Sequence, residues 1–206
     1  EIYLSKYSGW YSVSDEAFYS DDEIIEKDNE KISKISGSKV EWVEEESFFF
    51  KLSKWQNTLL DYYEKNPEFI RPESRRNEVV SFVKGGLKDL SISRKSLKWG
   101  IKVPSNNDHV IYVWLDALTN YLSALDFKSE DNDIYKNFWP ANLHLIGKDI
   151  IRFHAVYWPA FLLAANISLP KTIYGHGWIL SNDEKMSKSK GNILDLSLIH
   201  ISEPTR

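Results

Sequence analysis

The sequence has 206 residues, carries a net charge of −4 and contains no cysteine, which excludes disulfides and thiolate metal sites. Its 42% hydrophobic and 14% aromatic content allows a packed core and argues against global disorder. With 26 basic and 30 acidic residues, the chain has no protein-wide basic surface, so any contact with nucleic acid must be local.

Strand-favouring runs occupy much of the first 50 residues. Aromatic and β-branched residues mix with turn residues at 7–13 and 39–43. Between these runs, residues 20–34 are rich in charge and predict an exposed loop or a short helix.

Two helices are expected next. Ser53 has the residue type of a helix N-cap, and Pro67 follows the expected end of the first helix. Apolar residues recur between them at helical spacing, at Trp55, Leu59, Tyr62 and Tyr63. The second helix is predicted over residues 73–84, where Gly85 and Gly86 end it.

From residue 109 onward, buried strands alternate with helices. We predict strands at 109–114, 142–146 and 172–174, and helices at 116–125 and 150–165. This alternation is typical of a parallel sheet, so the expected fold class is α/β. A turn-rich stretch at 100–108 separates this region from the preceding one.

A loop near the carboxyl end concentrates positive charge. Lys185, Lys188 and Lys190 alternate with small or flexible residues. Such a cluster is most often a solvated surface loop, but lysines on a mobile loop at the edge of a sheet also suit a phosphate whose charge changes during reaction. No GxxxxGK[ST] sequence is present, so a P-loop ATPase does not explain it.

The loop sequence KMSKS, residues 185–189, resembles the signature of class I aminoacyl-tRNA synthetases. Further segments resemble the methionine family of this class, and the resemblance covers nearly all of residues 1–195. These segments are WLDA at 114–117, GKDI at 147–150 with Phe153 and His154, His176-Gly177, EEESFF at 44–49 and PESRRNE at 72–78.

The resemblance implies a domain organisation. Residues 1–105 would be part of the connective domain that is inserted into the nucleotide-binding fold. Residues 106–195 would be the second half of the Rossmann-type catalytic domain, with the KMSKS loop. Residues 196–206 depart from the family and resemble a non-native tail. Since the chain begins with Glu1 and its single methionine is Met186, we expect an internal fragment.

The resemblance also implies a methionine pocket. Aromatic walls suit a polarisable thioether, Tyr121 and His154 can donate a hydrogen bond toward its sulfur, and Asp149 can hold the substrate ammonium. Each residue alone has a structural explanation, since a histidine or tryptophan on an apolar face usually belongs to the core and Asp149 could be an N-cap. The implied pocket residues are Trp114, Ala117, Tyr121, Asp149, Ile150, His154 and Trp158.

The implied reaction joins methionine to tRNA(Met) through methionyl-adenylate, with ATP and Mg²⁺ as substrate. Lys185 and Lys188 would be the catalytic residues that stabilise the triphosphate, with His176 and Gly177 near the adenine or ribose. Without the first half of the nucleotide fold, the chain alone is expected to be inactive.

No metal site is expected. Many relatives bind zinc in the inserted domain, but this chain has hydroxyl or carboxyl residues at the corresponding positions, Ser12, Asp15, Ser33 and Ser36. We expect a metal-free knuckle held by Trp10, Tyr11, Phe18 and Trp42. A site formed by His144, His154 and His176 fits no short ligand motif.

The stretch 71–98 has eight basic and three acidic residues, and it could contact tRNA phosphates or simply form a solvated helix face. The longest nearly apolar run, residues 155–165, is shorter than the about 20 residues that span a bilayer, so no membrane partner is expected. The family implies a cytoplasmic location. Alternatives left open are a synthetase for another apolar amino acid, a non-catalytic tRNA-binding remnant, and a sequencing truncation without a role of its own.

Overall fold

A computed structural model describes residues 1–14, 17–19, 21–27, 30–34, 36–127, 133–181, 183–186 and 191–193. The α-helices are α1 (Gln56–Lys65), α2 (Glu73–Lys84), α3 (Val113–Ser123), α4 (Asp133–Phe138) and α5 (Trp158–Ala164). Three 3-10 helices span Asp21–Glu23, Leu52–Trp55 and Lys148–Ile150, and a π-helical turn spans Phe153–Tyr157.

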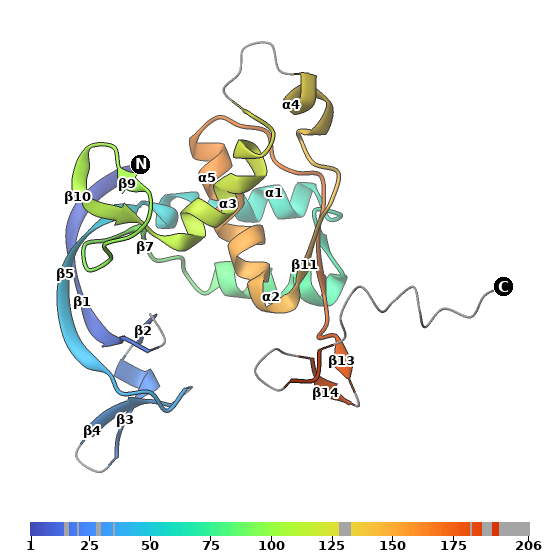
Figure 1. The fold of residues 1–206 in the computed structure, drawn as a ribbon. Helices are drawn as coiled ribbons and strands as arrows, with labels where there is room; N and C mark the ends of the chain where they lie inside the picture. Colours follow the sequence, from blue (N-terminus) through green and yellow to red (C-terminus); the bar gives the residue numbers. More distant parts are fainter. Residues whose placement is uncertain are drawn as a thin grey trace.

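Long antiparallel strands form one side of the molecule. Strands β1 (Ile2–Ser12) and β5 (Glu41–Phe50) pair along almost their whole length and curve together (Figure 1). Strands β2 (Ala17–Tyr19) and β7 (Leu90–Ser91) complete this sheet, in the order β2-β1-β5-β7. A second antiparallel sheet has the order β8 (Ser93–Arg94), β10 (Asn106–Ile111), β9 (Lys102–Val103).

The charged segment 20–34 contains a short helix, as its charge suggested, but most of its described part is a hairpin. After the three-residue 3-10 helix, β3 (Ile24–Lys27) and β4 (Glu30–Ser33) form an antiparallel hairpin. Ile24, Ile25 and Ile32 favour extended backbone, and pairing the two strands leaves most of the charged side chains in solvent.

The first predicted helix starts differently from the expectation. Ser53 lies inside the 3-10 helix, and its backbone N–H and Oγ both donate to Asp89 Oδ1, at 3.1 and 2.5 Å. The N-cap prediction was therefore wrong, because the Ser53 hydroxyl donates to Asp89, 36 residues away, and not to the helix. The second helix, α2, has the predicted bounds, and Gly86 follows its end with a φ of +101°.

The parallel sheet predicted for the second half is present, which confirms the α/β fold class. Its order is β11 (His144–Gly147), β12 (Ile173–His176), β6 (Ile70–Arg71), with both pairs parallel. Gly147 pairs with His176, so β11 and β12 end at the same edge. The two-residue strand β6 was not predicted. It brings the α1–α2 region alongside the second half of the chain (Figure 1).

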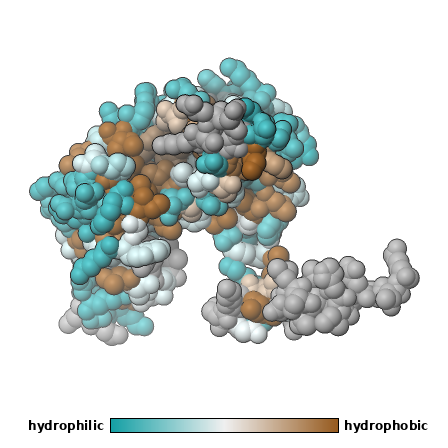
Figure 2. Space-filling model, turned by 45° about the horizontal axis from the view of Figure 1, so that its top comes forward, coloured by the Kyte–Doolittle hydropathy of each residue, from teal (hydrophilic) through white to brown (hydrophobic). Residues whose placement is uncertain are grey.

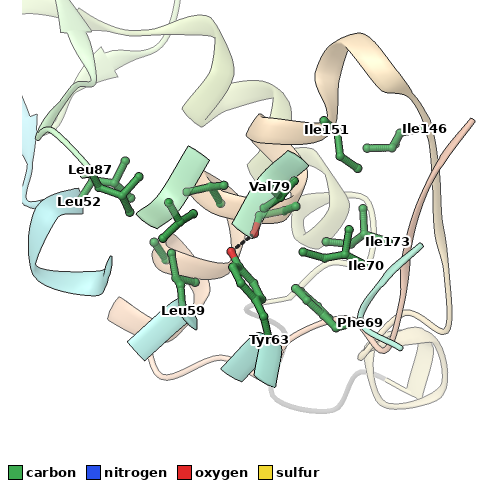
Figure 3. Close-up of a cluster of buried hydrophobic side chains, with 14 of the residues drawn as sticks. Leu52, Leu59, Tyr63, Phe69, Ile70, Val79, Leu87, Ile146, Ile151 and Ile173 are labelled. Atoms are coloured by element: carbon green, nitrogen blue, oxygen red, sulfur yellow. Dashed lines mark hydrogen bonds between the residues drawn. The ribbon is translucent and has the colours of Figure 1, made fainter. Parts of the chain in front are cut away.

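One hydrophobic core joins these two regions. Leu59 and Val79 come from the two early helices, whereas Ile151 and Ile173 come from the later segment, and all four are buried together (Figure 3). At its centre, the hydroxyl of Tyr63 donates to the Ala155 carbonyl at 2.5 Å. This core contains residues from both sides of the domain boundary expected at residue 105.

Two expectations for the later helices need correction. Helix α3 begins at Val113, so Trp114 lies in the first turn of a helix and not on a strand. The apolar run 109–114 fits either structure, and the helix begins directly after Tyr112. The segment 150–165 is not one regular α-helix, because it includes the π-helical turn before α5.

Candidate active site

The candidate site lies at the carboxyl edge of the parallel sheet. Lys148 and Asp149 follow β11, while His176 ends β12 and Gly177 and Trp178 come next. In open α/β sheets, ligands bind outside the carboxyl ends of the strands. The predicted pocket residues therefore come from this edge, from helix α3 and from the π-helical turn with the start of α5.

Hydrogen bonds join three of the predicted pocket residues, Ile150, His154 and Tyr121. His154 Nδ1 lies 3.0 Å from the Ile150 carbonyl oxygen, and its Nε2 lies 2.9 Å from the hydroxyl of Tyr121. A carbonyl only accepts, so Nδ1 carries the hydrogen. Burial lowers the pKa of His154, and the Ile150 carbonyl opposes that effect in part. The neutral ring therefore accepts a hydrogen bond from Tyr121 at Nε2.

This arrangement differs from the expected one. Tyr121 and His154 were both expected to donate to a substrate sulfur, but each donor hydrogen is already used inside the protein. The sequence could not reveal this, because Tyr121 and His154 are 33 residues apart. Binding a thioether through Tyr121 would require the hydroxyl to turn away from His154.

The aromatic side chains predicted to line the methionine pocket lie near one another. Trp114 stacks on Phe153 with ring centroids 3.7 Å apart and planes 12° apart. The ring of Trp158 is buried, and Tyr121 lies 6.2 Å from it. His144 lies against Tyr121 at 4.2 Å and was not expected to adjoin the pocket. From the sequence, His144 was a candidate only for a metal site.

The remaining predicted pocket residues are less buried than His154 and Trp158. Ala117 and Asp149 are exposed, and Ile150 is partly buried. Gly147 adjoins Asp149, and a Cβ there would come within 2.6 Å of Asp149 Oδ1, so the carboxylate would have to shift. Of the seven predicted pocket residues, Asp149 alone lines a cavity of about 450 Å³, together with Lys148, Arg152 and Trp178.

The structure places part of the predicted nucleotide site. Lys185 lies on β14 (Glu184–Lys185), which pairs with β13 (Leu180–Ser181), and its ammonium is 3.5 Å from the centroid of Trp178. His176 Nδ1 donates to the carbonyl of Gly177 at 2.6 Å. Lys188 and the tail 196–206 lie outside the described residues. Lys148 and Trp178 were missed by the sequence analysis, although Lys148 belongs to the GKDI motif.

Three of the four residues expected in place of zinc ligands are serines: Ser12, Ser33 and Ser36. Ser12 and Ser33 are buried, and the Ser33 hydroxyl lies 3.3 Å from the backbone N–H of Ser36. Asp15 lies outside the described residues. Trp10 and Trp42 meet edge to face at 5.1 Å. Among the described residues, no group of three or more His, Cys, Asp or Glu side chains is placed to hold a metal ion.

The basic stretch 71–98 is engaged partly within the protein. Arg71 pairs with Glu68, and Arg75 pairs with Glu78 at 2.6 Å. Arg94 is buried and donates to Ser91 at 2.7 Å, so it is poorly placed to contact a phosphate. In the part of the chain that the structure describes, no helix is long and apolar enough to cross a membrane.

A parallel sheet with lysines at its carboxyl edge is an arrangement found in nucleotide-binding α/β proteins. Comparison with known proteins is more specific. The chain belongs to the family described as "tRNA synthetases class I (M)", whose model matches residues 26–202.

The relatives that match this chain are named methionine–tRNA ligases. The chain is 61% identical over 194 residues to the methionine–tRNA ligase of Rickettsia bellii and 56% identical over 195 residues to that of Mycobacterium tuberculosis. These matches cover 94% and 95% of this chain, but the chain spans only 37% and 38% of the relatives' length. A crystal structure of the M. tuberculosis methionyl-tRNA synthetase bound by methionyl-adenylate superposes with a TM-score of 0.84, at 56% identity, over 94% of this chain and 38% of that one.

Proposed function

We propose that this chain is part of a methionine–tRNA ligase, which activates methionine with ATP and transfers it to tRNA(Met). The strongest support is the match to relatives with this name across 94% of the chain at 61% identity. The full-length polypeptide that would contain this chain is the parent protein.

In the proposed reaction, a methionine carboxylate oxygen attacks the α-phosphorus of ATP. The bond from that phosphorus to the bridging oxygen breaks, and pyrophosphate leaves with the electron pair. Lys185 and Lys188 would stabilise the charge on the leaving phosphates, and Mg²⁺ would arrive with the nucleotide as part of the substrate. His176 and Gly177 would adjoin the adenine or ribose.

The pocket of this chain would select the amino acid. The rings of Trp114, Tyr121 and Trp158 suit a long, polarisable side chain, and sulfur–aromatic contacts favour a thioether over a branched aliphatic chain. The exposed carboxylate of Asp149 would hold the ammonium of the substrate. Ala117, Ile150 and His154 complete the proposed pocket.

Contact with tRNA is proposed for the exposed basic residues of 71–98, with Arg94 as the least suited of them. The knuckle with Ser12, Ser33 and Ser36 is proposed to hold without zinc, since neutral hydroxyls are poor zinc ligands.

Methionine-dependent ATP–pyrophosphate exchange tests the proposal. The parent protein should catalyse exchange with methionine and not with isoleucine, valine or leucine. The 206-residue chain alone should be inactive, because it spans only 37% of the length of the relatives that carry the name. Exchange by the parent with another apolar amino acid would identify a different synthetase. Binding of tRNA without any exchange would support the non-catalytic alternative.

A further inference from the structure

The indole ring of Trp178 lies between two lysines. The ammonium of Lys185 is 3.5 Å from the ring centroid, and the ammonium of Lys148 is 5.0 Å from it. The three residues belong to separate segments: Lys148 follows β11, Trp178 follows β12, and Lys185 lies on β14. The fold thus brings two positive charges to one ring at the carboxyl edge of the parallel sheet.

Among the residues that the structure describes, no carboxylate forms an ion pair with Lys148 or Lys185. By contrast, Arg75 in the same cavity is paired with Glu78. An aromatic face attracts a cation without carrying a net negative charge, so it leaves the charge of the ammonium uncompensated. The ring can therefore position both ammonium groups without satisfying them.

The location suits an anion. Lys148 and Trp178 line the cavity of about 450 Å³ at the sheet edge, next to Asp149. The proposed function already assigns a phosphate-binding role to Lys185, whose ammonium shares the ring with Lys148.

We propose that Lys148 is a second phosphate-binding residue, which acts with Lys185 on the pyrophosphate part of ATP, and that Trp178 is a positioning residue for both lysines. This inference rests on the proposed function. When ATP binds, the two ammonium groups exchange the ring for phosphate oxygens. When pyrophosphate leaves, they offset the negative charge that it carries away.

The first test is a substitution in the parent protein. Lys148→Ala should raise the KM for ATP and the KM for pyrophosphate in the exchange reaction by about tenfold or more, the effect of one lost charge-assisted hydrogen bond. The KM for methionine should stay within about twofold of the parent value, and Lys148→Arg should restore part of the loss. Lys171→Ala is the matched control, because Lys171 is exposed and lies before β12, at the opposite end of the same sheet.

Trp178 needs a readout that a purely structural role would not change. Trp178→Leu should raise the KM for ATP about two- to fivefold, in keeping with a weak cation–π contact, without changing the KM for methionine or the Tm. Trp178→Phe keeps an aromatic face and should give a smaller effect. If Leu and Phe variants both match the parent, Trp178 does not position the lysines.

Direct binding separates this inference from the proposed function. A parent protein without methionine-dependent exchange would refute the proposed function, yet its affinity for inorganic pyrophosphate, measured by calorimetry, would still test Lys148. Equal pyrophosphate affinities in the Lys148→Ala and Lys171→Ala variants would overturn the inference. So would a Lys148→Ala variant in which only the KM for methionine rises, since Lys148 would then merely orient Asp149.

Discussion

His144 should make the stability of this chain fall in mild acid. Its side chain is buried, lies 4.2 Å from the ring of Tyr121 and 6.2 Å from the ring of Trp139, and its Nε2 has no hydrogen-bond partner among the described residues. Burial, followed by the nearby His154, lowers the pKa of His144 from 6.5 to about 4. Protonation in the folded state would leave a charge without compensation.

The direction of the effect follows from this lowered pKa. Above pH 6.5, His144 is neutral in both folded and unfolded chains, and the folded state keeps its full stability. As the pH falls from 6.5 towards 4, the unfolded chain binds a proton that the folded chain does not. The free energy of unfolding therefore decreases, by about 2 kcal/mol at pH 5 and by about 3 kcal/mol once the pH is below both pKa values.

Urea unfolding at pH 7.5 and pH 5.0 measures this contribution. His144→Leu keeps a similar volume but cannot bind a proton, so its loss of stability between the two pH values should be about 2 kcal/mol smaller than that of the original chain. His176→Gln is the control for removing a histidine at a less buried position. An equal loss of stability in the His144→Leu variant and the original chain would refute the assignment.

Three further substitutions have clear expected outcomes. Tyr63→Phe leaves a buried carbonyl without its donor and should lower the free energy of unfolding by about 1–3 kcal/mol in urea; an unchanged value would mean that another donor replaces the hydroxyl. Tyr121→Phe removes the donor to His154 and should raise the KM for methionine in the parent protein about tenfold while sparing the KM for ATP, whereas equal changes in both would indicate general damage. Gly100→Ala should destabilise the chain by more than about 1 kcal/mol, because Gly100 has a φ of +134° and an added Cβ would lie 2.4 Å from Val110 Cγ1. Val110→Ala in the same chain should relieve the clash but not the backbone strain. Full recovery in that double variant would show that strain contributes nothing.

The sequence predicted those elements whose local pattern is strong. Helix α2 starts and ends as expected because a proline precedes it and two glycines follow it. The strands β11 and β12 were recognised as short apolar runs, and their alternation with helices was enough to predict a parallel sheet. The candidate site was predicted mainly through family resemblance, since each side chain taken alone also fits a core position.

The sequence failed where distant side chains decide the structure. Ser53 was misread as an N-cap because Asp89, which accepts from it, lies 36 residues away. The bond between Tyr121 and His154 and the two lysines over Trp178 also depend on contacts between separate elements. No local periodicity contains this information, so the tautomer of His154 and the proposed role of Lys148 could be inferred only from the structure.

The early helices support the candidate site although they contribute no side chain to the proposed methionine pocket. The hydroxyl of Tyr63 on α1 binds the carbonyl of Ala155, inside the same π-helical turn that presents His154. Strand β6 pairs with β12, whose end carries His176. The position of His154 opposite Tyr121 thus depends on contacts between residues before and after residue 105. A change at Tyr63 should therefore weaken methionine binding in the parent protein as well as stability, because it loosens the turn that holds His154 in place.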